Sequence, residues 1–277
     1  MKNILQEMRP RQWTKNFFVY AALLFHGSLF DAEKFWAVTE IFAAFCLLSS
    51  GVYFFNDIFD YAADRINPDK KNRPIAAGKI SIPLGYFCAA VFSTVALIVA
   101  YRLNAECFAL LFSYAAVNFL YTTRLKHVII LDVLAIAYGF VVRALAGAAA
   151  AAIFLTEWFL LCVMFLSIFL ALGKRRHELI SGKSARKVLQ SYSVELLDQL
   201  TTIIAAALII CYALFAVNAG RAMALTVPLV LYGIFYYLYV VRVKGKGGAP
   251  EILLYAEPPI LLTVMLYVAA IIFIRNF

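Results

Sequence analysis

The residues of this sequence that could do chemistry are concentrated in one polar stretch, NDIFDYAADRINPDKKNRPIAAGKI at 56–80. Its carboxylates Asp57, Asp60 and Asp64 are three and four positions apart, which places them on one face of a helix. Like charges at this spacing destabilise a helix unless a cation neutralises them. Mg²⁺ is a hard ion that binds carboxylate oxygens together with substrate phosphates. The spacing therefore predicts a catalytic Mg²⁺ site with these aspartates as metal ligands and Asn56, the i+4 neighbour of Asp60, beside them.

The second half of the stretch is basic. The segment NPDKKNRP at 67–74 contains two prolines that end the helix, so Lys70 and Arg73 lie in a turn after it. Arginine binds phosphate through two parallel hydrogen bonds, and lysine acts as a point charge. An acidic stripe followed by a basic turn predicts a site for Mg²⁺ and a diphosphate substrate. The alternative is a solvated loop of mixed charge that only follows the enrichment of cations in cytoplasmic loops.

The composition indicates that these charges lie at the surface of a membrane protein. The chain has 277 residues, of which 64% are hydrophobic and 15% are charged, against about 45–50% and about 25% in ordinary soluble domains. A soluble protein of this size could not bury so much apolar surface. The net charge of +9 does not indicate nucleic acid as a partner, because the basic residues lie in short tracts between apolar runs.

Nine apolar segments are candidates for membrane-spanning helices, each of which needs about 20 residues. They are 16–30, 35–55, 82–101, 106–122, 129–153, 157–172, 196–217, 225–241 and 256–274. No segment indicates a separate soluble domain. We therefore expect an all-α, polytopic membrane protein with nine transmembrane helices and a single domain over residues 1–277.

The distribution of cations predicts the orientation of these helices. Twenty of the 25 Lys and Arg lie before the first segment or in every second loop, and four lie on the other side. The long loops 56–81, 173–195 and 242–255 are all on the cation-rich side. Because cytoplasmic loops are rich in Lys and Arg, we expect a multi-pass protein of the cell membrane. Its N-terminus and active site would face the cytoplasm, and its C-terminus would lie outside.

The pattern NDxxDxxxD at 56–64, which ends an apolar segment and precedes a basic loop, resembles the first aspartate-rich motif of the UbiA superfamily of intramembrane prenyltransferases. The resemblance implies nine transmembrane helices around a central cavity, with a Mg²⁺–diphosphate substrate at its cytoplasmic mouth. Further segments resemble one branch, the decaprenyl-phosphate phosphoribosyltransferases. These are RPRQWTKN at 9–16, DRINPDKKNRPIAAG at 64–78, YTTRLKHVIILDVLAIAYGFVVRALAG at 121–147, LGKRRHEL at 172–179 and GGAPE at 247–251.

One departure from ordinary prenyltransferases is informative. The family has a second aspartate-rich motif on the loop after its sixth helix, whereas the corresponding tract here contains Lys174, Arg175 and Arg176 with one carboxylate, Glu178. Three consecutive cations favour binding of an anion over a second metal site. A neutral aromatic acceptor would leave them without a partner, whereas a lipid phosphate would pair with them. The alternative is again the cation enrichment of cytoplasmic loops.

Three further residues are candidates for substrate binding. Lys15 precedes the first apolar segment and is either an interfacial anchor or, as the resemblance implies, a phosphate ligand. Tyr121 and Lys126 are similar to a tyrosine–lysine motif that the family has after its fourth helix, although their spacing is one residue longer.

Arg143 lies deep in an apolar segment, where a charge is costly and usually faces a cavity or a partner. It is expected either to contact substrate or to tie helices together. Asp132 is three turns away, about 16 Å along a helix, so it is expected to pair with Lys126 or Arg124 instead.

These observations favour Mg²⁺-dependent transfer of 5-phosphoribosyl from 5-phosphoribosyl 1-diphosphate to a polyprenyl phosphate. Diphosphate would leave, and C1 of the sugar would be inverted. The first alternative is a prenyltransferase that joins an isoprenyl diphosphate to an aromatic or other small acceptor. The second is a transporter or lipid flippase, which would have no use for a carboxylate stripe of the kind that binds Mg²⁺.

Overall fold

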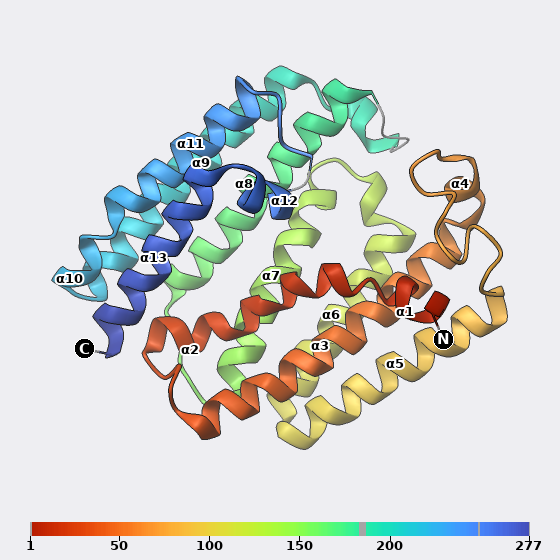
Figure 1. The fold of residues 1–277 in the computed structure, drawn as a ribbon, viewed down its shortest axis with the longest axis horizontal. Coiled ribbons are helices and arrows are strands. Elements are labelled where there is room, and N and C mark those ends of the chain that lie inside the picture. Colours follow the sequence, from red (N-terminus) through yellow and green to blue (C-terminus); the bar gives the residue numbers. More distant parts are fainter. Residues whose placement is uncertain (1, 183–186, 249, 277) are drawn as a thin grey trace. The chain divides into compact units, whose positions relative to one another are not determined.

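The protein is described by a computed structural model that covers residues 2–182, 187–248 and 250–276. Every regular element in these residues is a helix (Figure 1). The elements are α1 (Lys2–Met8), the 3₁₀ helix η1 (Pro10–Tyr20), α2 (Ala21–His26), α3 (Ala32–Phe59), α4 (Tyr61–Ile66), α5 (Ile82–Leu103), α6 (Ala105–Thr123), η2 (Leu125–His127), α7 (Leu131–Ala150), α8 (Glu157–Ser181), η3 (Lys187–Ser191), α9 (Val194–Asn218), α10 (Arg221–Ala224), α11 (Val227–Arg242), α12 (Pro250–Ala256) and α13 (Pro258–Asn276).

Eight helical spans in the described residues are long and apolar enough to cross a membrane, and they coincide with eight of the nine expected segments. The protein is therefore an integral membrane protein with the expected all-α fold. The remaining segment, expected at 16–30, does not form one α-helix: residues 16–26 belong to η1 and α2, and residues 27–30 follow α2 as a turn. Because a 3₁₀ helix rises about 2.0 Å per residue, η1 and α2 together extend about 31 Å, close to the thickness of the hydrocarbon core.

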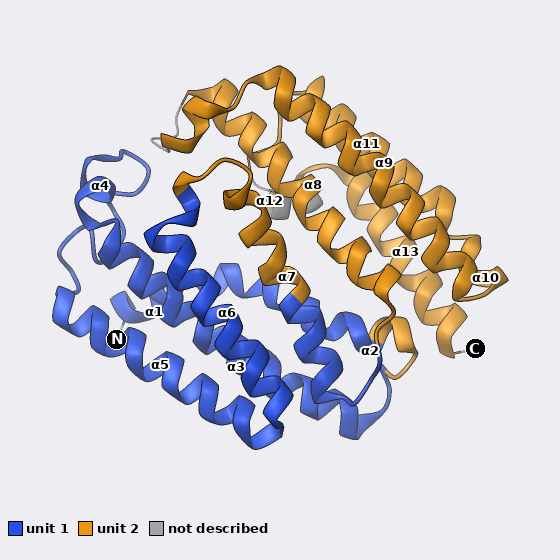
Figure 2. Cartoon of the chain, turned by 180° about the vertical axis from the view of Figure 1, so that it is seen from behind, with its two compact units in different colours: residues 1–23, 29–126, 142–154 blue, residues 24–28, 127–141, 155–277 orange. Residues whose placement is uncertain are grey.

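The chain forms two compact units, which Figure 2 shows in two colours. Unit 1 contains residues 1–23, 29–126 and 142–154, and unit 2 contains residues 24–28, 127–141 and 155–277. The division falls within α7, so neither unit is one continuous stretch of chain. The single domain expected over residues 1–277 stays a prediction.

Unit 1 is built around α3, which packs most extensively against α5. The loop between them is held by its own apolar residues, because Ile75 and Ile80 are buried against Phe54 and Ile58 of α3. The same loop contains the basic turn predicted from the sequence. Its position against the C-terminal end of α3 is therefore fixed by packing as well as by charge.

Among the glycines of unit 1, Gly147 of α7 leaves the least room for a side chain. A methyl group added there would lie 1.8 Å from the carbonyl oxygen of Val19 in η1, a contact with backbone that no side-chain rotation relieves. We expect Gly147→Ala to lower the free energy of unfolding by about 3 kcal/mol, at the upper end of overpacking costs. The midpoint of thermal unfolding in detergent measures this loss.

Gly233 of α11 is the matched control, because an added methyl group would lie 3.5 Å from Thr263 Cγ2, an ordinary contact. Gly233→Ala should be neutral or stabilising, since alanine has the higher helix propensity. An equal loss of thermal stability in both variants would show that the close contact of Gly147 with Val19 does not limit stability.

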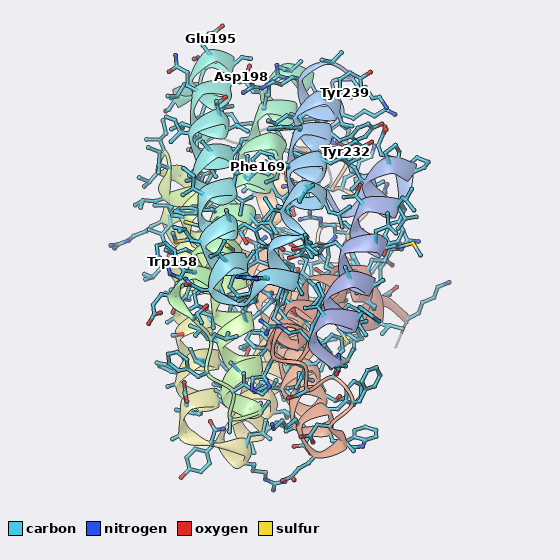
Figure 3. All side chains as sticks on the ribbon, turned by 90° about the vertical axis from the view of Figure 1, so that its left-hand side faces the viewer. Trp158, Phe169, Glu195, Asp198, Tyr232 and Tyr239 are labelled. Atoms are coloured by element: carbon cyan, nitrogen blue, oxygen red, sulfur yellow. The ribbon has the colours of Figure 1, made fainter. Side chains whose placement is uncertain are left out.

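Unit 2 is a bundle in which α8 packs mainly on α9, and α11 packs on α13. Figure 3 shows Glu195 and Asp198 of α9 at one end of this bundle, near Tyr239 of α11, with Trp158 of α8 towards the other end. Asp198 at the first end pairs with Arg176 and Arg242, and Phe169 and Tyr237 are buried in the apolar core between the helices.

Candidate active site

The aspartate stripe lies where α3 ends and α4 begins. Asp60 lies between the last residue of α3 and the first of α4, and its φ of −90° and ψ of 7° bend the chain there. The bond from the Asp64 N–H to the Asp60 carbonyl, 2.8 Å, keeps the two helices joined. α4 ends at Ile66 because the next residue, Asn67, is extended before Pro68. The helix break predicted from the prolines is therefore confirmed.

Asp57 and Asp64 converge on one cation. Both are 1% exposed. Arg73 Nη1 of the basic turn lies 3.1 Å from Asp57 Oδ1 and 2.6 Å from Asp64 Oδ2. Lys70 Nζ lies 3.3 Å from Asp64 Oδ1. The structure thus brings together two of the predicted metal ligands and both predicted phosphate-binding cations.

Asp60 points elsewhere. Lys126 Nζ lies 2.5 Å from Asp60 Oδ1, and the bend at Asp60 accounts for this divergence from the other two carboxylates. Asn56 donates to Asp57 Oδ1 at 3.3 Å and accepts from the Thr122 hydroxyl at 3.4 Å. Thr122 follows Tyr121, which is half-buried. The end of α6 therefore lies beside the end of α3.

Two residues of this cluster were not predicted from the sequence, Glu7 and Arg9. Arg9 donates to Asp57, and its guanidinium lies 4.8 Å from the centre of the Tyr53 ring. Glu7 is 1% exposed and lies beside Asp57. Burial, followed by the neighbouring Asp57 carboxyl, raises the pKa of Glu7 to about 8, so Glu7 holds a proton at neutral pH. The only signal for Arg9 was its place in RPRQWTKN.

The donor atoms of this cluster fit a hard divalent cation. The position of Arg73 Nη1 shows that a single cationic group reaches carboxylate oxygens of both Asp57 and Asp64. Within the described residues, no three His, Cys, Asp or Glu side chains come together as a complete metal site. Mg²⁺ commonly takes one or two carboxylates and completes its shell with water and substrate phosphates. Asp57 and Asp64 suffice for that mode, and Asp60 as a third ligand stays a prediction.

The tract Lys174–Glu178 corrects the sequence analysis. It is not a loop, because α8 continues to Ser181 and ends at Gly182, whose φ of 62° suits glycine. Arg175 is 1% exposed, and its Nε lies 2.7 Å from Asp132 Oδ2. Its Nη1 lies 2.8 Å from Glu178 Oε2. The prediction that Asp132 pairs with Lys126 or Arg124 was therefore wrong.

Tyr192 completes this buried group. Its hydroxyl donates to Asp132 Oδ1 at 2.9 Å and accepts from the Ile130 N–H at 2.8 Å. Burial raises the pKa of Tyr192 to about 12, so the hydroxyl remains a donor. Asp132 thus has an arginine on one oxygen and a tyrosine on the other, and the group is fully built from unit 2.

Arg176 also has a carboxylate partner. Its Nε lies 2.9 Å from Asp198 Oδ1 of α9, and Arg242 Nε lies 3.2 Å from the same oxygen. The argument that three cations would lack partners without an anionic substrate was therefore wrong for Arg175 and Arg176. Lys174 is half-buried and has no carboxylate partner among the described residues, so it is the cation of the tract best suited to a substrate phosphate.

Arg143 lies in a buried polar network in unit 1. Its Nε donates to Asn16 Oδ1 at 2.8 Å, and its Nη2 donates to the Tyr114 hydroxyl at 2.9 Å. Its guanidinium also lies 5.5 Å from the centre of the Phe45 ring. These contacts favour the helix-tying role over substrate contact. Lys15, next to Asn16 in η1, is half-buried.

The remaining segment of the resemblance, at 247–251, is described only in part. Ala249 and the side chains of Pro250 and Glu251 lie outside the described residues. Two cations just before it pair with Glu257, because Lys244 Nζ and Lys246 Nζ lie 2.6 and 2.9 Å from its two oxygens. Hydrogen bonds from these lysines lower the pKa of Glu257 to about 2.

The fold and the site together define a class of protein. It is an integral membrane protein whose described elements are all helical, with a carboxylate-rich helix end beside a basic turn. Residues 16–256 match the UbiA prenyltransferase family, and the chain belongs to that family. It is 36% identical to the decaprenyl-phosphate phosphoribosyltransferase of Mycolicibacterium smegmatis over 271 residues, which cover 91% of this chain and 85% of that one. It is 34% identical to the enzyme of the same name from Corynebacterium glutamicum over 263 residues, 90% of this chain and 79% of that one.

Solved structures agree on the fold. A UbiA homolog from Archaeoglobus fulgidus bound to GPP and Mg²⁺ superposes with a TM-score of 0.78 at 18% identity, covering 99% of this chain and 100% of that one. The same homolog bound to DMAPP and Mg²⁺ gives a TM-score of 0.79 at 17% identity, with 99% of each chain covered. At these identities the likeness shows the fold alone.

Proposed function

We propose that this protein is a phosphoribosyltransferase of the membrane, which moves 5-phosphoribosyl from 5-phosphoribosyl 1-diphosphate to a polyprenyl phosphate and requires Mg²⁺. The observation that carries the proposal is the convergence of Asp57 and Asp64 on Arg73, with Lys70 beside them. The names of the relatives, which match over about nine-tenths of this chain, support the choice of donor and acceptor.

The donor has the charges that this cluster would bind. Asp57 and Asp64 would hold Mg²⁺, which when bound offsets the charge of the diphosphate group. Arg73 and Lys70 would then turn from the carboxylates to the phosphate oxygens, since arginine and lysine bind both kinds of anion. The cluster would thus exchange its internal ion pairs for contacts with the substrate. Its cations would stabilise the negative charge that develops on the diphosphate as it leaves.

The reaction breaks the bond between C1 of the sugar and the diphosphate oxygen, and it forms a bond between C1 and an oxygen of the lipid phosphate. The acceptor is already anionic at neutral pH, so no strong general base is required. The main task of the protein is to hold two anions that repel each other in a reactive orientation. Attack from the face opposite the leaving group inverts C1.

Lys174 is the residue of the Lys174–Arg176 tract that we assign to the acceptor phosphate, because Arg175 and Arg176 are paired with carboxylates. The excess of Lys and Arg on one side of the expected spans supports an orientation with the N-terminus and the aspartate stripe at the cytoplasmic face and the C-terminus outside. A soluble phosphorylated sugar donor is available only from that side, which agrees with this orientation.

A labelled-donor assay tests the proposal. Membranes that contain the protein, polyprenyl phosphate and Mg²⁺ are given either labelled 5-phosphoribosyl 1-diphosphate or labelled isoprenyl diphosphate with an aromatic acceptor. We expect lipid-extractable label only from the ribosyl donor, and none when a chelator removes Mg²⁺. Label from the isoprenyl donor alone would establish the prenyltransferase instead. Label from neither donor would favour a transporter or flippase.

A further inference from the structure

Glu7 is a buried carboxyl that donor binding, as proposed above, does not use. It lies in the short helix α1, is 1% exposed, and is beside the carboxyl of Asp57. Burying such a group without partners is costly. One of its oxygens, Oε2, accepts a hydrogen bond from the backbone N–H of Ile75 at 3.4 Å. That contact joins residues 68 positions apart in the chain.

The partner of Glu7 belongs to the basic turn. Ile75 is fully buried and follows Arg73 by two residues. The Arg73 side chain in turn lies between Asp57 and Asp64. A displacement of the backbone at Ile75 would therefore move the guanidinium away from the carboxylates. Glu7 contacts both sides of this arrangement, the Ile75 backbone and the Asp57 side chain.

We propose that Glu7 is a positioning residue that holds the turn at 67–80 against the end of α3, so that Arg73 and Lys70 are in place for the donor diphosphate. The inference rests on the proposed function, because it assigns the donor to these two cations. Glu7 acts through the hydrogen bond to Ile75 and through its contact with Asp57. The hydrogen bond to Ile75 needs only an acceptor oxygen at this position, so a neutral side chain of the same shape that keeps such an oxygen should replace Glu7.

Limited trypsin digestion of the protein in membranes reports whether the turn is held in place, because the rate of cleavage is measured without any assay of activity. Lys71 and Lys79 are exposed and followed by residues that permit cleavage, whereas Arg73 precedes Pro74. In Glu7→Met, which fills the volume but accepts no hydrogen bond, we expect cleavage after Lys71 to be about tenfold faster, since a buried N–H loses its acceptor. Glu7→Ala should behave in the same way.

Glu7→Gln is the conservative variant, because its amide oxygen accepts from Ile75 and its amide nitrogen donates towards Asp57. It should be cleaved at the rate of the unmodified protein. Gln6→Ala is the matched control on the exposed face of α1 and should also be unchanged. In the transfer assay, Glu7→Met should raise KM for 5-phosphoribosyl 1-diphosphate about tenfold and change kcat by less than about twofold, with Glu7→Gln near the unmodified protein.

Two results would overturn the inference. Equal cleavage rates in Glu7→Met, Glu7→Ala and the unmodified protein would show that Glu7 does not hold the turn. A Glu7→Gln variant as impaired as Glu7→Met would show that the carboxylate charge itself is needed. Because cleavage is measured without turnover, failure of the proposed function would appear separately, as absence of ribosyl transfer in the unmodified protein.

Discussion

Asp57→Asn and Asp64→Asn should each lower the rate of ribosyl transfer by at least about a hundredfold, the loss typical when one element of charge stabilisation is removed. Both side chains are 1% exposed and share Arg73, so each amide removes an oxygen proposed to bind Mg²⁺ and also weakens the ion pair that positions Arg73. The measurement is lipid-extractable label from 5-phosphoribosyl 1-diphosphate at saturating Mg²⁺.

Asp69→Asn is the matched control, because Asp69 lies in the same turn and is exposed. It should retain the activity of the unmodified protein. A Mg²⁺ titration of the two impaired variants gives a second test, since a weakened metal site should need more Mg²⁺ for half-maximal rate. Full Mg²⁺-dependent activity in both Asp57→Asn and Asp64→Asn would refute the site.

Asp60→Asn should have a smaller effect than either, and the reason shows what the sequence could not predict. Helical spacing alone puts the three aspartates on one stripe, but the bend at Asp60 turns its carboxylate to Lys126. A bend depends on the backbone angles of one residue, which the residue type does not determine. The sequence therefore indicated which carboxylates lie near this helix end, whereas the divergence of Asp60 from the other two required the structure.

The membrane spans were predictable because each depends on a local property. A run of about 20 apolar residues has few alternatives to a spanning helix in a chain of this composition. The segment expected at 16–30 departs from the expectation, because its residues up to Tyr20 belong to the 3₁₀ helix η1. The ends of helices were harder to predict, and α8 extends nine residues beyond the expected 172 because nothing before Gly182 breaks it.

Partners of buried charges were not predictable, because they join residues far apart in the chain. Arg175 pairs with a carboxylate 43 positions away, and Glu7 meets a backbone group 68 positions away. From their charge alone, Lys174, Arg175 and Arg176 were equally good candidates for binding an anionic substrate. Burial and pairing separate them, and they leave Lys174 as the candidate for the acceptor phosphate.

Breaking the buried ion pair of Asp132 and Arg175 should have the second-largest effect of a single substitution, in this case on the free energy of unfolding. Asp132 is fully buried and Arg175 is 1% exposed. Asp132→Ala would leave the guanidinium without its buried carboxylate, at a cost of about 3–5 kcal/mol. The midpoint of thermal unfolding in detergent should fall accordingly. Arg175→Met should be similarly destabilising, because among the described side chains it leaves the Asp132 carboxylate with the Tyr192 hydroxyl alone.

The double variant Asp132→Leu with Arg175→Met distinguishes a structural pair from a substrate site. Replacing a whole buried ion pair by apolar residues of similar volume is often neutral or stabilising. Glu178 is partly exposed and can turn to water, so most of the stability should return. If Arg175 only supports the fold, the double variant transfers ribosyl groups with an unchanged KM for polyprenyl phosphate, whereas Lys174→Met raises that KM and leaves stability unchanged. A stable double variant with a raised KM for polyprenyl phosphate would show that Arg175 contributes to binding of the acceptor.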